Sequence, residues 1–406
     1  MEWLNVTLDQ ITTRIGDGLH GTPKYDLSGD YFFINGNNLS GGKIIIKDDT
    51  KRISKDVYNK IKKELNNRTL LVAINGTLGN LALYQGEKIA LGKSACYINL
   101  SEDVNKDFIR YVLEHNDFQQ YARSFATGAT IKNLGLKAVR DYSFKLPPLP
   151  TQKRIASILS AYDDLIENNS KRIKLLEEIA QRTYEEWFVK FRVNGEQLAI
   201  DEDTGLPLGW EFKKAEQLFN IKIGKTPPRE QENWFRTDSE GIKWASIKDI
   251  NNASVFISNT SERITNLGVE KFNMNVAQRG TVILSFKLTV GKVTIVTEDM
   301  VTNEAIAHFN YTKDCIFDKS FIYVYLKRFN YHSLGSTSSI GTAINSKIVK
   351  AMPFLVPDIT SLNLFQEFAN PLFDQIEQIL NMNFLLKQSR DILLPRLMSG
   401  TINIES

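Results

Sequence analysis

Residues 155–187 read IASILSAYDDLIENNSKRIKLLEEIAQRTYEEW, and the spacing of their apolar side chains decides the fold. Two interleaved heptad series predict one continuous helix with an apolar seam. The first series is Leu159, Ile166, Ile173, Ala180 and Trp187, and the second is Ile155, Tyr162, Asn169, Leu176 and Thr183. At about 1.5 Å per residue, roughly 40 helical residues make a rod on the order of 60 Å long.

A second stretch with the same spacing lies near the end of the sequence. Its apolar residues again fall seven apart: Phe365, Leu372, Ile379, Leu386 and Leu393. It ends at Gly400, where glycine is the usual stop signal. A lone rod would expose its seam, so we expect the two helices to pack antiparallel against each other. The alternative, in which each helix only covers its own domain, is also compatible with the heptads.

The rest of the chain reads the same way twice, about 210 residues apart. The run Phe108-Ile109-Arg110-Tyr111-Val112-Leu113 returns at 321–326, and the turn Leu78-Gly79-Asn80 returns at 290–292. Residues 128–131 likewise match residues 341–344. Two diverged copies of one unit suggest two sites that do the same kind of job on different targets. Duplex DNA, which is itself quasi-symmetric, is a suitable partner for that arrangement.

Each copy mixes short β-rich runs, glycine-containing turns and amphipathic helical stretches, which predicts an α+β fold. Proline residues end both globular parts, at 147–150 and at Pro357, because proline continues neither a strand interior nor a helix. We expect two similar globular domains separated by two long antiparallel coiled-coil helices, with a pseudo-twofold internal repeat. The expected order is a first domain at 1–148, a helix at 149–192, a linker at 193–206, a second domain at 207–357, a helix at 358–400 and a tail at 401–406.

Composition narrows the class of protein. The 406 residues are 42% hydrophobic and 24% charged, as in an ordinary globular protein, and no apolar run approaches membrane-spanning length. The two cysteines, Cys96 and Cys315, are far apart and lack metal-ligand spacing, which favours a reducing cytoplasm. The net charge of +3 neither demands nor excludes a nucleic acid.

Enzyme signatures are incomplete. Gly92-Lys93-Ser94 resembles the end of a phosphate-binding loop, but the upstream Gly86 is one residue too far away. Residues 370–373 resemble an adenine methyltransferase signature without its second proline, and Pro357-Asp358 begins a nuclease motif without the Glu-x-Lys that completes it. We therefore expect a non-catalytic chain with no catalytic residue, no metal site and no cofactor of its own.

Polar loops remain at corresponding places in both copies. The loops at 16–24, 35–38, 92–94 and 127–133 correspond to those at 224–229, 246–249, 302–304 and 341–347. Lysine, arginine and threonine suit phosphates, and asparagine, lysine and arginine suit base edges. Any one of these loops is equally compatible with a solvated turn. The candidate DNA-contacting residues are His20, Thr22, Lys24, Asn35, Asn37, Asn38, Lys93, Ser94, Lys132, Asn133, Lys225, Thr226, Arg229, Lys248, Asp249, Lys287, Asn303 and Lys347.

With this layout the chain resembles, along essentially its full length, the specificity subunit of type I restriction-modification enzymes. Residues 16–23 and 31–39 look like one common class of its target-recognition domain. Leu206-Pro207-Leu208-Gly209-Trp210 looks like the usual entry to such a domain. The most specific local match is the ending at 393–400, LLPRLMSG, which is similar to the close of the second helix in this family.

The resemblance implies a DNA-reading subunit whose two target-recognition domains each read one half of a split target, with the helices setting the spacer. It also implies two modification subunits docked on the helices, and restriction subunits joined to them. S-adenosylmethionine, ATP and Mg²⁺ would then belong to those partners. Trp187 and Phe188 suit either docking or packing against the domains. Two alternatives stay open, a self-contained DNA methyltransferase or nuclease, and a duplicated coiled-coil scaffold that binds proteins without DNA.

Overall fold

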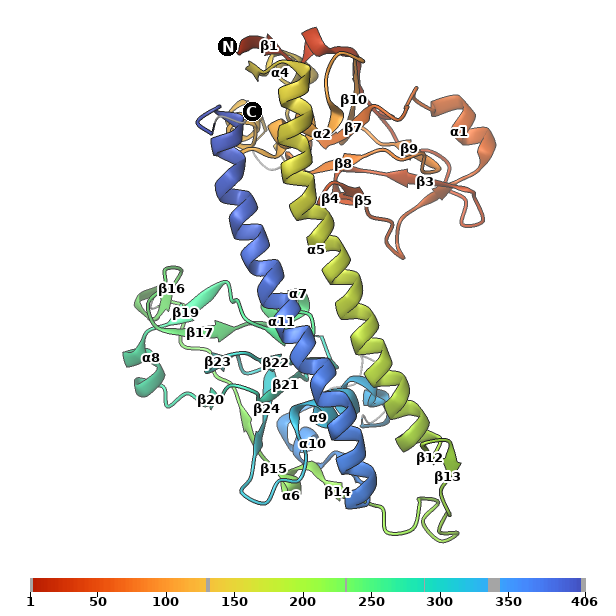
Figure 1. Ribbon diagram of the computed structural model, residues 1–406, viewed down its shortest axis with the longest axis vertical. Helices are drawn as coiled ribbons and strands as arrows, with labels where there is room; N and C mark the ends of the chain where they lie inside the picture. Colours follow the sequence, from red (N-terminus) through yellow and green to blue (C-terminus); the bar gives the residue numbers. More distant parts are fainter. Residues whose placement is uncertain (1–2, 129–131, 231, 288, 335–343, 403–406) are drawn as a thin grey trace. The chain divides into compact units, whose positions relative to one another are not determined.

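The structure is a computed structural model that describes residues 3–128, 132–230, 232–287, 289–334 and 344–402. The chain forms two compact units. The first consists of Met1–Glu167 with Leu385–Ser406, and the second of Asn168–Phe384. Each unit holds one globular domain and a part of both long helices (Figure 1). The sequence match between 128–131 and 341–344 lies mostly outside the described residues, so the structure does not bear on it.

The first globular domain is built from short strands with helices beside them. Its strands are β1 (Leu4–Thr7), β2 (Thr12–Asp17), β3 (Tyr31–Ile34), β4 (Leu39–Ser40), β5 (Lys43–Ile44), β6 (Arg52–Ile53), β7 (Thr69–Ala73), β8 (Leu81–Leu83), β9 (Ile89–Leu91), β10 (Ala95–Leu100) and β11 (Ser143–Leu146). Its helices are η1 (Asp9–Ile11), η2 (Gly36–Asn38), α1 (Lys55–Ile61), α2 (Lys106–Glu114), α3 (Asn116–Phe125) and α4 (Leu136–Asp141).

These strands form a four-stranded sheet in the order β2-β10-β7-β8 and a three-stranded sheet in the order β6-β3-β9. Strands β3 and β9 are parallel, and the four-stranded sheet is antiparallel. Buried side chains such as Ile34, Leu71, Leu91 and Tyr97 fill the space between the two sheets. Strands β1 and β11 pair separately.

The second globular domain repeats this plan. Its strands are β14 (Glu211–Lys214), β15 (Phe219–Ile223), β16 (Phe235–Arg236), β17 (Ile242–Ala245), β18 (Phe256–Ile257), β19 (Glu262–Ile264), β20 (Val276–Ala277), β21 (Val282–Ser285), β22 (Lys292–Val296), β23 (Met300–Thr302), β24 (Ile306–Tyr311) and β25 (Pro353–Val356). Its helices are α6 (Ala215–Leu218), η4 (Glu232–Trp234), α7 (Ile247–Asn252), α8 (Asn266–Lys271), α9 (Lys319–Arg328), η5 (Tyr331–Leu334) and α10 (Ser346–Ala351). The preceding hairpin pairs β12 (Arg192–Val193) with β13 (Glu196–Gln197).

The strand orders correspond between the two domains, and the sheets of the second domain have additional edge strands. The second domain has one sheet in the order β15-β24-β21-β22-β18 and another in the order β16-β19-β17-β23-β20. Thus β15-β24-β21-β22 corresponds to β2-β10-β7-β8, and β19-β17-β23 corresponds to β6-β3-β9. The pair β17–β23 is parallel, like β3–β9, and β14 pairs with β25 as β1 pairs with β11. The predicted α+β fold with an internal repeat is confirmed.

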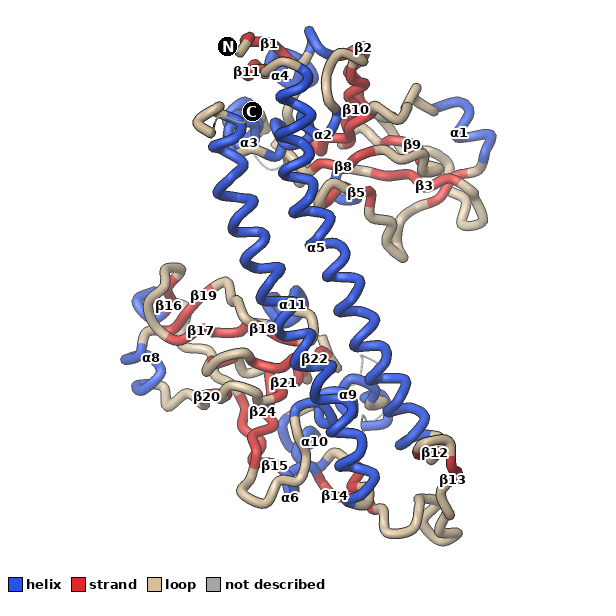
Figure 2. Tube along the Cα trace, in the orientation of Figure 1, coloured by secondary structure: helices blue, strands red, loops and turns tan. Residues whose placement is uncertain are grey.

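One helix in each domain, α2 in the first and α9 in the second, lies between the main sheet and the long helices (Figure 2). The Asn105 side chain accepts a hydrogen bond from the Phe108 N–H (2.8 Å), which starts α2. Asp318 starts α9 in the same way. The residues from Ser320 to Leu326 are all buried, because sheet strands cover one side of α9 and the long helices cover the other. Helices α2 and α9 therefore join the main sheet of their domain to the long helices.

The long helices are α5 (Leu149–Tyr184), which continues as a π-helical turn η3 (Glu185–Val189), and α11 (Ile359–Met398). In the first unit, Ile155 and Leu159 of α5 share an apolar cluster with Leu397 of α11. In the second unit, the buried Asn169 donates from Nδ2 to Oδ1 of Asn383 (2.9 Å). The predicted antiparallel packing of the two helices is confirmed, and each also covers its own domain.

The seam residues divide by burial. Ile155, Leu159, Asn169, Ile173, Phe365 and Ile379 are buried, and Tyr162, Ile166, Leu176, Leu372, Leu386 and Leu393 are half-buried. Pro371 lies inside α11, which continues on both sides of it, so the incomplete methyltransferase signature at 370–373 is part of a helix. Phe188 is buried in the apolar cluster of the second unit, and Trp187 packs against that cluster. None of the helices in the described residues combines the length and apolar character that a membrane span requires.

Candidate nucleic-acid interface

Backbone hydrogen bonds bring four polar loops of the first domain together. The Leu19 N–H donates to Leu91 O (2.7 Å), and the Gly92 N–H donates to Ile34 O (2.8 Å). The loop before β10 is joined to the end of β7, because the Ile74 N–H donates to Ser94 O (3.0 Å). The Leu134 N–H then donates to the Ile74 carbonyl (2.8 Å), which adds the segment before α4. Candidate residues distant in sequence therefore lie on one edge of the domain.

Two hollows open on this edge. One has a volume of about 330 Å³ and is lined by His20, Thr22, Asn35 and Lys93, among others. The other has a volume of about 470 Å³ and shares His20 and Lys93 with the first, and Asn133 also lines it. The His20 imidazole is held by a 2.6 Å contact between its Nε2 and Oδ2 of Asp17. Both hollows are open, and polar side chains that can meet base edges and phosphates line them beside apolar ones.

The second domain joins its loops with the same hydrogen bonds. The Lys225 N–H donates to Thr302 O (2.8 Å), as Leu19 does to Leu91. The Asn303 N–H donates to Ala245 O (3.1 Å), as Gly92 does to Ile34. The Ile306 N–H donates to Asn303 O (3.2 Å), just as the Ala95 N–H donates to Gly92 O (3.0 Å). The loops of the two domains thus share one backbone arrangement, which we call the loop scaffold, and they carry different side chains on it.

In each domain a glycine, Gly18 or Gly224, allows one loop to pass close to the backbone of the neighbouring loop. A Cβ on Gly18 would lie 2.1 Å from the Leu91 carbonyl oxygen, and a Cβ on Gly224 would lie 2.2 Å from the Asn303 carbonyl oxygen. Backbone atoms cannot yield as a flexible side chain does, so any larger residue must displace the loop.

We expect Gly18→Ala and Gly224→Ala each to lower the free energy of unfolding by about 1–3 kcal/mol, the usual effect of overpacking. The loop that follows each glycine should also show faster hydrogen exchange. Gly135→Ala is the matched control, because a Cβ there meets no atom within 4 Å. Denaturant unfolding and hydrogen-exchange mass spectrometry of the full chain measure both effects. Equal stability of the Gly18 and Gly135 variants would contradict the steric argument.

Two of the candidate residues turn inward as caps. The Asn38 side chain accepts from the Asn35 N–H (3.0 Å), and the Asp249 carboxylate accepts from the Ser246 N–H (2.9 Å), at equivalent positions of the two domains. Asn38 is 5% exposed and Asp249 is 8% exposed. Burial raises the pKa of Asp249, but hydrogen bonds from Ser246 and Ser261 outweigh it, and the net pKa is lowered. Asn38 and Asp249 each position a turn. The exposed residue of that turn is Asn37 in the first domain and Lys248 in the second.

The remaining candidates differ in how far their side chains are free to contact DNA, because some already bind other groups of the protein. Lys225 Nζ donates to the carbonyl oxygens of Phe272 (3.0 Å) and Asn273 (2.7 Å). The Arg229 guanidinium forms two hydrogen bonds to Glu262 (2.7 and 2.9 Å) and stacks 3.8 Å from the ring centre of Phe235. The other lysines among the candidates, Lys24, Lys132, Lys287 and Lys347, are exposed.

Glu304 is a residue of this surface that the sequence candidates omit. It is exposed, and its Oε2 accepts a hydrogen bond from the Thr226 hydroxyl. Behind its loop, the buried His308 imidazole contacts Thr302 Oγ1 (2.7 Å) through Nε2. Burial lowers the pKa of His308 to about 4, so this imidazole is neutral at physiological pH. The charged group of this loop is therefore the Glu304 carboxylate. A search for cationic residues does not find it.

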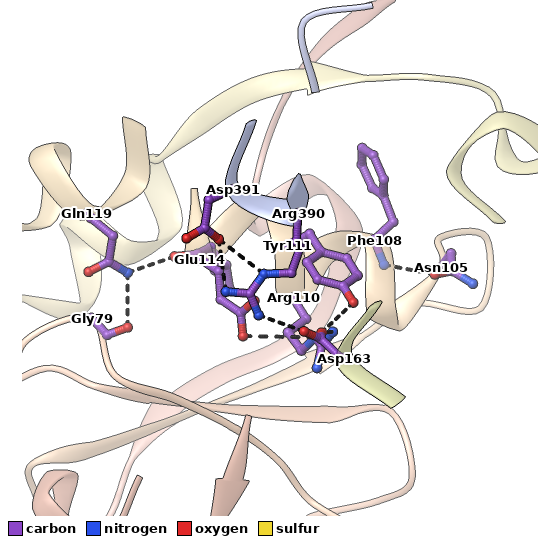
Figure 3. Close-up of polar contacts among 11 residues, drawn as sticks. Gly79, Asn105, Phe108, Arg110, Tyr111, Glu114, Gln119, Asp163, Arg390 and Asp391 are labelled. Carbon is purple, nitrogen blue, oxygen red and sulfur yellow. Dashed lines mark hydrogen bonds and ion pairs between the residues drawn. The ribbon is translucent and has the colours of Figure 1, made fainter. Parts of the chain in front are cut away.

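An ionic cluster connects the first domain to both long helices within the first unit (Figure 3). Asp163 of α5 accepts from Arg110 (2.6 Å) and Tyr111 (2.6 Å) of α2, and from Arg390 (2.6 Å) of α11. Burial raises the pKa of the nearby Glu114. In the second unit, Tyr323 takes the place of Arg110 in the repeat and donates to Glu177 of α5 (2.7 Å). Among the described residues, no group of three or more His, Cys, Asp and Glu side chains is placed to hold a metal.

The sequence pattern of the family described as "Type I restriction modification DNA specificity domain" matches this chain at residues 2–178 and 207–366. The two matched ranges contain the two globular domains.

Individual relatives agree with the family match. The type I restriction enzyme MjaIX specificity subunit of Methanocaldococcus jannaschii is 24% identical, over 95% of this chain and 86% of its own. The HindI specificity subunit of Haemophilus influenzae is 24% identical, over 73% of this chain and 77% of its own. The crystal structure of the type I restriction-modification S subunit from M. genitalium has a TM-score of 0.56 at 17% identity and covers 98% of this chain and 96% of that one. That structure therefore shares the fold.

Proposed function

Because the chain belongs to the type I restriction modification DNA specificity family, as a non-catalytic specificity subunit of a type I restriction enzyme, we propose that each globular domain reads one half of a bipartite DNA target. The observation that carries this proposal is the shared loop scaffold. The same backbone hydrogen bonds hold loops 16–22 and 91–95 in one domain and loops 224–226 and 302–306 in the other. Different side chains on one scaffold are what two readers of unlike half-sites require.

The reading surface comprises the exposed and half-buried polar residues of these loops. In the first domain it centres on His20, Asn35, Lys93 and Asn133, which line the two hollows. In the second it centres on Thr226, Asn303 and Lys248. Asn38 and Asp249 support this surface from inside, where they cap the turns. Lysines on the surrounding loops supply phosphate contacts, which orient the duplex without reading its sequence.

The long helices set the spacer between the two half-sites. In the second unit the buried Asn169–Asn383 pair supports this role, since a polar pair inside an apolar seam favours a single register. A helix pair in one fixed register keeps a constant length, as a spacer requires.

The helices also dock two modification subunits, which in turn bring restriction subunits into the complex. The exposed apolar residues on α5 and α11 support this proposal, because a partner that covers them removes their apolar surface from water. They are Leu165, Leu175, Ile179, Leu364, Phe368, Met382, Phe384, Leu385 and Ile392. S-adenosylmethionine, ATP and Mg²⁺ bind to these partner subunits in the cytoplasm.

Exchange of residues 1–148 for the corresponding domain of another specificity subunit tests the proposal. We expect the adenine-methylation motif in cells that also carry the modification subunit to change in one half, with the other half and the spacer preserved. The reciprocal exchange of residues 207–357 should change the other half. Genome-wide methylation mapping reads out both experiments. A motif in which both halves change after one exchange, or no bipartite motif with the native chain, would refute the proposed division of labour.

A further inference from the structure

Lys93 and Glu304 occupy the same position of the repeated scaffold. Each directly follows a residue whose N–H donates across to the neighbouring strand end, Gly92 to Ile34 in one domain and Asn303 to Ala245 in the other. Each is exposed. The loop backbone thus places an ammonium group in the first domain where it places a carboxylate in the second.

The residue beside each of them is also equivalent. His20 follows Gly18 by two residues and shares both hollows with Lys93. Thr226 follows Gly224 by two residues and donates a hydrogen bond to the Glu304 carboxylate. The correspondence therefore extends from the backbone to side chains that lie next to one another, and it does not depend on sequence identity.

An exposed carboxylate on a surface that meets DNA requires an explanation. Phosphates repel it, so it weakens binding to any duplex unless a base compensates. A carboxylate only accepts hydrogen bonds, and the major-groove group that matches it is the N4 amino group of cytosine. A lysine ammonium only donates, and its match is O6 and N7 of guanine.

We propose that Lys93 and Glu304 are equivalent specificity-determining residues of opposite hydrogen-bonding character, Lys93 selecting guanine in one half-site and Glu304 selecting cytosine in the other. This inference rests on the proposed function, since it assumes that both domains face DNA. Thr226 orients the Glu304 carboxylate before DNA arrives. The same position of the repeated loop therefore reads guanine where its side chain is a cation and cytosine where its side chain is an anion.

The test combines methylation mapping with competition binding for Glu304→Gln, Glu304→Lys and Lys93→Glu, each in the complex with the modification subunit. Glu304→Gln keeps the size of the side chain and an oxygen for Thr226. It should lose about 10- to 100-fold of discrimination at one base pair of one half-site, the usual value of a good base contact. Glu304→Lys should select guanine where the native chain selects cytosine, and Lys93→Glu should make the converse change in the other half.

Glu270→Gln and Lys60→Glu are controls with matched charge changes at exposed positions on helices α8 and α1. They should leave the motif unchanged. A Glu304→Gln variant that keeps the native motif, or that binds every sequence more tightly by the same factor, overturns the inference and leaves the proposed function intact. A native complex that methylates no bipartite motif refutes the proposed function itself, so the two failures are distinguishable.

Discussion

Replacing Asp163 by alanine should lower the stability of the first unit by about 3 kcal/mol, because it removes the hydrogen-bonded anion of the buried Arg110. Asp163 accepts hydrogen bonds from Arg110, Tyr111 and Arg390, each at 2.6 Å. Only 11% of the Arg110 side chain is exposed, so water cannot replace the lost carboxylate at that guanidinium. Hydrogen exchange should accelerate in α2 and in the parts of α5 and α11 that belong to the first unit. The second domain should be unaffected.

Asp164→Ala is the control, because that carboxylate is the next residue on the same helix and is exposed. Its effect should stay within about 0.5 kcal/mol, as for surface substitutions in general. Equal exchange rates in the Asp163 and Asp164 variants would show that the cluster contributes no stability.

The contribution of Asp163 should also depend on pH in one direction. Burial alone would raise its pKa, but the hydrogen bonds from Tyr111 and Arg390 and the charges of Arg110 and Arg390 lower it below the ordinary 3.8. A lowered pKa in the folded state means that the stabilisation is complete above the ordinary value and is lost as pH falls through the folded value. The stability difference between the native chain and Asp163→Asn should therefore be constant above about pH 5 and should shrink in more acidic solution. A difference that grew as the pH fell would contradict this assignment.

The long helices and the duplication are predictable from the sequence because each leaves a periodic signal. Heptads place Leu159 and Phe365 on a seam whatever the rest of the chain does, and both side chains are buried. The correspondence of loops 92–94 and 302–304 is also visible in the sequence, and the structure holds them with equivalent hydrogen bonds. Local and repeated patterns therefore carry most of the fold.

The role of each polar side chain is less predictable, because it depends on partners that are distant in sequence. Lys225 suits a phosphate by its chemistry, but its ammonium group is bonded to carbonyls at the end of α8. Asn38 and Asp249 suit base edges, but they face inward as caps. For these two a local signal exists, since Asn35-x-x-Asn38 and Ser246-x-x-Asp249 have the spacing of a capping box. Glu304 is detectable from an alignment of the two copies, where it stands opposite Lys93.

Phe365→Ala should lower the stability of the second unit by about 3–5 kcal/mol, the usual effect of removing a buried aromatic ring. Phe365 is fully buried and lies edge-on to Tyr184, Trp187, Phe188 and Phe321, with ring centres 5.3–6.2 Å away. Tyr184 belongs to α5, Trp187 and Phe188 to the π-helical turn, and Phe321 to α9. A single side chain of α11 therefore joins both long helices to α9. Apolar clusters join both domains to the long helices, and aromatic rings are concentrated in the cluster of the second domain.

Phe368→Ala is the matched control, because it removes the same ring from the same helix at a position that is 41% exposed. It should change the free energy of unfolding by less than about 1 kcal/mol, since the native ring is partly hydrated already. Denaturant unfolding monitored by tryptophan fluorescence suits this comparison, because Trp187 and Trp210 lie in or against the same cluster. If Phe365→Ala and Phe368→Ala shifted the tryptophan transition equally, the aromatic cluster would not be what holds α11 to the second domain. We expect only Phe365→Ala to shift the transition. Its complex should also lose methylation of both half-sites at temperatures that the native complex tolerates. Together these results would show that target recognition depends on the packing of the second domain against its helices.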